Sequence, residues 1–160
     1  MSYLNPKKLI SEYLTNASSP DLNVDGSVTP VEFSYRPNKG ETVNIARLLI
    51  YLEGGTNFAA EDFANLATAL TNGLTISFDG AQVASWRDNV DIVTTMYDVE
   101  GYASLNNIAR SISGRWTLNR AAPGFAGVEV TYENGGVVAT VNDNLSTLTQ
   151  FRIRAQGHVV

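Results

Sequence analysis

Residues 149–156 read TQFRIRAQ, a stretch in which polar and apolar side chains alternate without interruption. A period of two places every second side chain on the same face of an extended strand. The same alternation occurs in residues 31–36 (VEFSYR), 74–78 (LTISF) and 112–118 (ISGRWTL). Residues 43–52 (VNIARLLIYL) become apolar on both faces, which predicts a central strand covered on both sides. The chain is therefore predicted to be mainly β.

Turn-forming residues separate these stretches at short spacing. Asp79-Gly80 is a strong hairpin signal between two extended runs. Residues 134–136 (NGG) predict another hairpin, between strands at 128–132 and 137–141. Many short strands with turns between them are typical of an antiparallel β-sandwich or jelly roll, and this is the predicted fold class.

Two helices are also predicted. One begins at Asn5 as the capping residue and Pro6 at the first helical position. Its apolar face would consist of Leu9, Ile10, Tyr13 and Leu14. A second helix is predicted over residues 57–70, in a connection between strands. Residues 1–20 are accordingly interpreted as an N-terminal helical arm and residues 21–160 as the β-sandwich domain.

Composition restricts the function classes. The chain has no Cys, which excludes disulfides and thiolate metal sites. Its net charge of −5 argues against nucleic acid as a partner, because such binding needs a basic surface. No signal peptide and no apolar run near the ~20 residues of a membrane span are visible, so we expect a soluble chain that is made in a cytoplasm and has no membrane contact.

One stretch matches the calcium-binding loop of the EF-hand. Residues 21–32 (DLNVDGSVTPVE) carry Gly at the sixth place and possible oxygen ligands at Asp21, Asn23, Asp25, Thr29 and Glu32. Glu32, however, lies inside a strand-like pattern, and residues 18–20 (SSP) interrupt the helix that should enter the loop. A turn at Asp25-Gly26 that leads into a strand is the preferred interpretation, and no metal or cofactor is predicted.

The sequence contains no recognisable set of catalytic residues. His158 is the only histidine, and no nucleophile elbow, phosphate-binding loop or clustered metal ligands accompany it. We therefore predict that the chain is not an enzyme. Among the aromatic residues, Trp116 is in phase with an apolar strand face, whereas Trp86 precedes a polar stretch and is the preferred surface anchor.

Four phrases together resemble small virion structural proteins of tailed bacteriophages, of the head-decoration or cement kind. They are residues 23–35 (NVDGSVTPVEFSY), 46–53 (ARLLIYLE), 69–74 (ALTNGL) and 151–159 (FRIRAQGHV). The resemblance implies a β-sandwich or jelly roll that coats and braces the capsid lattice and is assembled in the host bacterial cytoplasm. It offers no catalytic residues to carry over.

The first function hypothesis is therefore a capsid decoration protein in the virion, bound to the major capsid protein or another virion protein as a homo-oligomer, either a dimer or a trimer. Leu9, Ile10, Tyr13, Leu14 and Trp86 are the candidate interface residues. The alternatives are a tail- or fibre-associated module that binds a host glycan, with Trp86 as its anchor, and a structural protein of the tail or connector.

Overall fold

A computed structural model describes residues 7–54, 71–86, 98–103, 110–117 and 127–160. Within these residues the chain forms ten strands and no helix. They are β1 (Leu9–Tyr13), β2 (Val31–Tyr35), β3 (Thr42–Gly54), β4 (Leu74–Phe78), β5 (Ala81–Trp86), β6 (Asp98–Ala103), β7 (Arg110–Thr117), β8 (Val128–Thr131), β9 (Val137–Val141) and β10 (Gln150–Val159). The prediction of a mainly β chain is confirmed.

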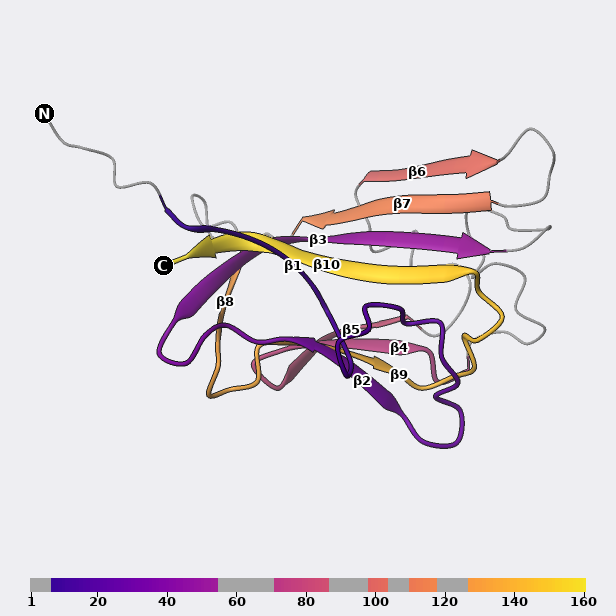
Figure 1. Cartoon of the computed structure of the whole chain (residues 1–160), viewed down its shortest axis with the longest axis horizontal. Helices are drawn as coiled ribbons and strands as arrows, with labels where there is room; N and C mark the ends of the chain where they lie inside the picture. The colour runs from indigo at the N-terminus through magenta and orange to yellow at the C-terminus, as the bar shows by residue number, and fades with distance from the viewer. Residues whose placement is uncertain (1–6, 55–70, 87–97, 104–109, 118–126) are drawn as a thin grey trace, which may run out of the picture.

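The strands belong to two antiparallel sheets, which form two layers (Figure 1). The larger sheet has the order β1-β10-β3-β7-β6, with β8 also paired to β3. The smaller sheet has the order β2-β9-β4-β5. Consecutive strands of the chain therefore lie side by side in only part of the fold.

The strand pairs are nested around one hairpin. β4 and β5 are joined at Asp79-Gly80, as predicted, and both turn residues have positive φ (48° and 80°), as the tight hairpin turn requires. Outside this hairpin β3 pairs with β7 and β8, then β2 with β9, and finally β1 with β10. Successive pairs alternate between the smaller and the larger sheet, so the two halves of the chain run side by side across both layers.

β3 is the longest strand, and it has two different neighbours along one edge. Its first residues pair with β8 and its later residues with β7. On its other edge the register with β10 shifts so that Ala46 has no opposite residue. This is a β-bulge, which bends a strand and increases its twist. Gly157 is required there, because a Cβ would collide with the carbonyl oxygen of Asn44.

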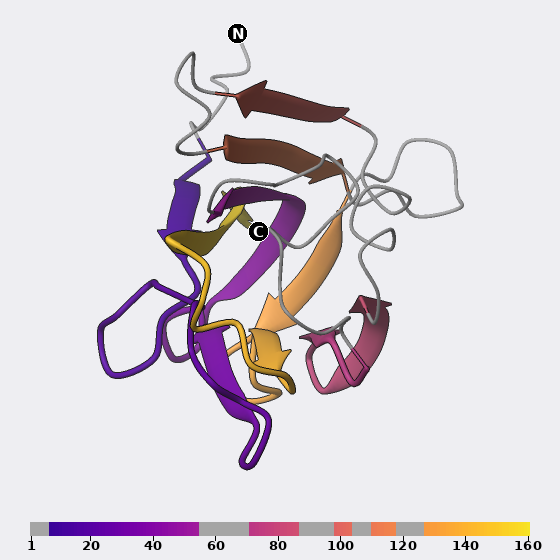
Figure 2. The ribbon, with the colours of Figure 1, turned by 90° about the vertical axis from the view of Figure 1, so that its right-hand side faces the viewer.

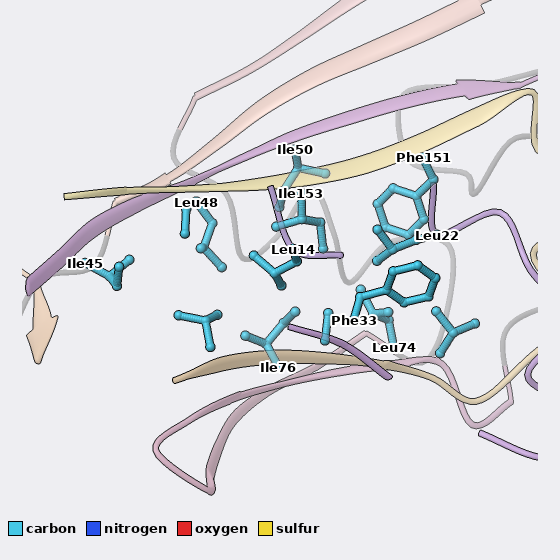
Figure 3. Packing of buried hydrophobic residues seen from close by; sticks show 14 of the residues in the cluster. Leu14, Leu22, Phe33, Ile45, Leu48, Ile50, Leu74, Ile76, Phe151 and Ile153 are labelled. Atoms are coloured by element: carbon cyan, nitrogen blue, oxygen red, sulfur yellow. The ribbon is translucent and has the colours of Figure 1, made fainter. Parts of the chain in front are cut away.

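The core lies between the two sheets and is filled by their inward-facing side chains (Figure 3). β4 and β9 alternate strictly between buried and half-buried residues, and β10 does so from Gln150 to Gln156, as the period-two pattern predicts. Fully burying one such side chain stabilises the fold by about 1.5–3 kcal/mol. The largest fully buried side chains are Phe33, Phe151, Leu14, Leu22, Ile45, Leu48, Ile50, Leu52, Leu74 and Ile76.

The predicted N-terminal helix is wrong, because Leu9–Tyr13 is a strand that pairs with β10 along its whole length. Leu14 follows in the core and donates its backbone N–H to the carbonyl of Ile153 at 2.9 Å. An isolated helix of this length is marginal in water, whereas a strand on β10 gains a ladder of hydrogen bonds. Tertiary pairing therefore overrides the helical spacing of the apolar residues. The second predicted helix, over residues 57–70, lies outside the described residues.

The predicted hairpin across residues 128–141 is also wrong. β8 pairs with β3 in the larger sheet, whereas β9 lies between β2 and β4 in the smaller one. Asp79 stabilises the connection between β8 and β9. Its carboxylate accepts a hydrogen bond from the backbone N–H of Thr131 at 3.0 Å, and its own N–H donates to the carbonyl of Gly136 at 2.9 Å. The glycines at 135 and 136 predict that the chain changes direction, but they do not predict which sheet β9 joins.

Candidate functional site

The outer face of the larger sheet carries the most distinctive cluster of polar side chains among the described residues. In an antiparallel sheet, directly opposite residues share a face. The register places Tyr13 of β1, Arg154 of β10 and Leu49 of β3 in one row. The next row contains Arg152 and Tyr51. Two arginines and two tyrosines from three strands therefore meet on one face.

These rows line a hollow of about 440 Å³, which we call the sheet hollow. It is lined by Tyr13, Leu49, Ile50, Tyr51, Gln150, Arg152 and Arg154. Its uncharged lining is mainly aromatic and aliphatic, and its charged groups are the guanidinium groups of Arg152 and Arg154. The hollow therefore combines an apolar surface with positive charge, on a chain whose net charge is −5.

The two arginines of the sheet hollow have different partners. Arg152 Nε donates to Asp21 Oδ1 at 2.8 Å, and this hydrogen bond, more than any other cause, raises the pKa of Arg152. The guanidinium of Arg154 lies over the Tyr13 ring, 4.2 Å from its centre. Among the described side chains, no carboxylate lies within ion-pair distance of Arg154. Its charge is therefore available to an anionic group from outside.

The side chains of the sheet hollow are of the kinds that bind a ligand. A guanidinium held on an aromatic ring presents a planar set of N–H donors that matches a carboxylate or phosphate. The face of a tyrosine ring can pack against the flat apolar side of a sugar or another ring. In the described part of the chain, no group of three His, Asp or Glu side chains is close enough to hold a metal ion.

The residues that match the calcium-loop pattern lie in different surroundings. Asp21 pairs with Arg152, and the Asn23 amide donates to the carbonyls of Leu148 and Thr149. Asp25 accepts hydrogen bonds from the backbone and the hydroxyl of Ser27 in a local turn. Thr29 is exposed, and Glu32 lies on an exposed position of β2 opposite Thr140. The five oxygen-bearing residues are thus not drawn around one point.

The predicted interface residues are divided between surface and core. Leu9 is 82% exposed, and Ile10 and Tyr13 are half-buried on β1. Leu14 is fully buried within its own chain. Trp86 ends β5 opposite Leu74, and its side chain lies outside what the structure describes.

Sequence reasoning missed Leu49, Tyr51, Arg152 and Arg154 as site residues. A signal was present, because the alternation in residues 149–156 puts both arginines on the polar face of one strand. What the sequence did not contain was the strand order. β1 and β3 become neighbours of β10 only through long-range pairing.

No protein-family model matches the chain, and comparisons with curated proteins and with solved structures found no match either.

None of the described residues belongs to a helix long and apolar enough to cross a membrane.

Proposed function

We propose that this chain is a jelly-roll structural protein of a tailed-phage virion, and that it decorates and braces the capsid. The nested strand order carries this proposal. Pairs that alternate between two antiparallel sheets around a central hairpin are expected of a jelly roll, a β-sandwich architecture used by viral capsid and lectin domains. The resemblance of residues 23–35, 46–53, 69–74 and 151–159 to phage decoration proteins supports the same function.

In this role the chain binds the major capsid protein as a homo-oligomer. Each copy adds contact area between neighbouring capsid subunits, and the added area opposes the outward pressure of the packaged genome. A symmetric homo-oligomer presents one patch several times, which suits a repeating lattice. The function requires no catalytic residue, metal or cofactor. A structural role in the tail or connector would use the same architecture.

Cosedimentation with capsids tests this function. The purified chain is mixed with tailed-phage capsids from which the decoration proteins have been stripped. We expect saturable binding at a fixed number of chains per capsid subunit, and binding should raise the temperature at which the capsids open. Capsids that still carry their own decoration proteins are the control and should bind little. Absence of binding to stripped capsids at micromolar concentration would contradict the capsid role.

The sheet hollow favours a second candidate function, recognition of a host glycan. Tyr13 and Tyr51 line the hollow with aromatic rings, and Arg154 supplies a donor for an acidic sugar. On an array of neutral and acidic bacterial oligosaccharides, Tyr13→Ala should lower the affinity about ten-fold, the scale of losing one aromatic anchor. The exposed Tyr132 lies outside the hollow, so Tyr132→Ala is the matched control and should leave binding unchanged. Equal affinity in both variants would exclude the hollow as the glycan site.

A further inference from the structure

β1 lies at the border of the larger sheet, and only one of its edges pairs with β10 (Figure 2). The hydrogen bonds at its two ends show which backbone groups face that partner. Val159 donates its N–H to the carbonyl of Lys8, and Leu14 donates to Ile153, both at 2.9 Å. Backbone groups alternate in direction along a strand, so the even-numbered residues 8–14 point toward β10.

The odd-numbered residues of β1 consequently point their N–H and C=O groups away from the sheet. Among the described residues, Thr15 is the first of them whose backbone groups have a partner, because it exchanges two hydrogen bonds of 3.0 Å with Ser34. Within the described part of the chain, the backbone groups of Leu9, Ser11 and Tyr13 have no backbone partner. An unpaired row of this kind is a template for another strand.

A second hollow lies beside the unpaired edge of β1. It has a volume of about 400 Å³, and its lining comes from β1 and from the chain around β2. Lys8, Glu12 and Arg36 are among its lining residues, together with Ile10 and Tyr35. Within the described residues the free edge borders this hollow, and charged groups of both signs flank it.

We propose that the strand added here is β1 of a second copy of this chain, paired antiparallel across a two-fold axis at Ser11. The larger sheets of the two copies then form one continuous sheet. In this register Leu9 lies opposite Tyr13 of the partner subunit, and Ser11 lies opposite Ser11 of the partner subunit. The interface closes on itself, so it yields a dimer and not a fibre.

The side chains of β1 match this register. Leu9, which is 82% exposed, is covered by an aromatic ring, and the small Ser11 lies at the crowded axis. Lys8, which pairs with Glu41 of its own chain at 3.4 Å, is diagonal to Glu12 of the partner subunit, so opposite charges approach each other. A parallel arrangement would instead place Lys8 beside Lys8 and Glu12 beside Glu12. The charges therefore favour the antiparallel pairing.

The dimer also enlarges the sheet hollow. Leu9 of the partner subunit would join the row formed by Tyr13, Arg154 and Leu49. The inference specifies the homo-oligomer of the proposed function, but the dimer does not need a capsid to form. A failure of capsid binding and a failure of dimerisation can thus be told apart.

A single cysteine provides the test, because the natural chain has none. Facing residues that exchange both backbone hydrogen bonds have Cα atoms about 5.5 Å apart, within the range of a disulfide, about 4.4–6.8 Å. Ser11→Cys should therefore form a disulfide-linked dimer under mild oxidation. The matched control is Leu9→Cys, whose sulfurs lie four residues apart along the paired strands, roughly 13 Å. It should stay unlinked, whereas a mixture of Leu9→Cys and Tyr13→Cys chains should cross-link.

Light scattering supplies the second measurement. The natural chain should have twice its 17.3 kDa mass at micromolar concentration. Ser11→Pro removes an N–H that points away from β10, so the fold should persist while the mass falls to that of a monomer. Ser11→Ala keeps the N–H and should remain a dimer. A monomeric natural chain, or equal cross-linking of Ser11→Cys and Leu9→Cys, would overturn the proposal.

Discussion

The guanidinium of Arg154 lies 4.2 Å from the centre of the Tyr13 ring, on the outer face of the larger sheet. The two residues come from opposite ends of the chain and face each other across β10 and β1. Their contact helps to hold β1, the border strand, against β10. It also holds the positive charge of the sheet hollow in a defined place.

This contact should be measurable as a coupling energy. A cation over an aromatic ring at a partly exposed site contributes about 0.5–1 kcal/mol. We expect a double-mutant cycle with Arg154→Met and Tyr13→Leu to give a coupling of that size in urea unfolding at constant protein concentration. Tyr13→Phe keeps the ring and should preserve most of the coupling. Additive effects of Arg154→Met and Tyr13→Leu would show that the two side chains act independently.

Leu9 and Leu14 should respond very differently to truncation. Leu14→Ala opens a cavity in the core and should lower the free energy of unfolding by about 2–5 kcal/mol. Leu9→Ala removes an exposed side chain and should change the unfolding free energy of the monomer by about 0.5 kcal/mol or less. Urea denaturation at low protein concentration measures both. Similar losses at the two positions would instead fit the helical face predicted from the sequence.

Gly157 should tolerate no side chain at the bulge. A Cβ there would overlap the backbone of Asn44, so Gly157→Ala should destabilise the fold by about 1–3 kcal/mol, and Gly157→Asn by more. Gly40 is a useful control, because it has positive φ but open space around it. Asn accepts that conformation, so Gly40→Asn should be nearly neutral. A mild effect of Gly157→Asn would mean that β3 and β10 can separate locally at little cost.

Stability should depend on pH through Asp25. The side-chain hydrogen bond from Ser27 and then its backbone hydrogen bond lower the pKa of Asp25, because both favour the ionised carboxylate. A pKa that is lower in the folded than in the unfolded chain stabilises the fold above the unfolded value. That contribution is lost as the pH falls through the folded value.

Ser27→Ala separates this effect from others. It should raise the pKa of Asp25 toward its usual value, as measured by NMR titration. It should also lower the unfolding free energy at about pH 7 and have little effect at about pH 2, where the carboxylate is protonated in both states. The same destabilisation at both pH values would show that the Ser27 hydroxyl acts through something other than the charge of Asp25.

Local patterns of residues were sufficient to predict the individual strands and one hairpin of this fold. Alternation in residues 149–156 and 74–78 predicted strands with one buried face, because the two faces of a strand meet different surroundings. Asp79-Gly80 predicted its hairpin, since few other residues adopt two successive positive φ values. Each of these signals is complete within a short stretch of chain.

Which strands become neighbours, in contrast, depends on the folded chain as a whole. The apolar residues of 9–14 have helical spacing, yet they form a strand because β10 offers them a hydrogen-bonding edge. β8 and β9 enter different sheets although glycines join them. The sheet hollow and the free edge of β1 follow from pairings between residues far apart in sequence. Such pairings depend on the packing of the whole chain, and no local pattern encodes them.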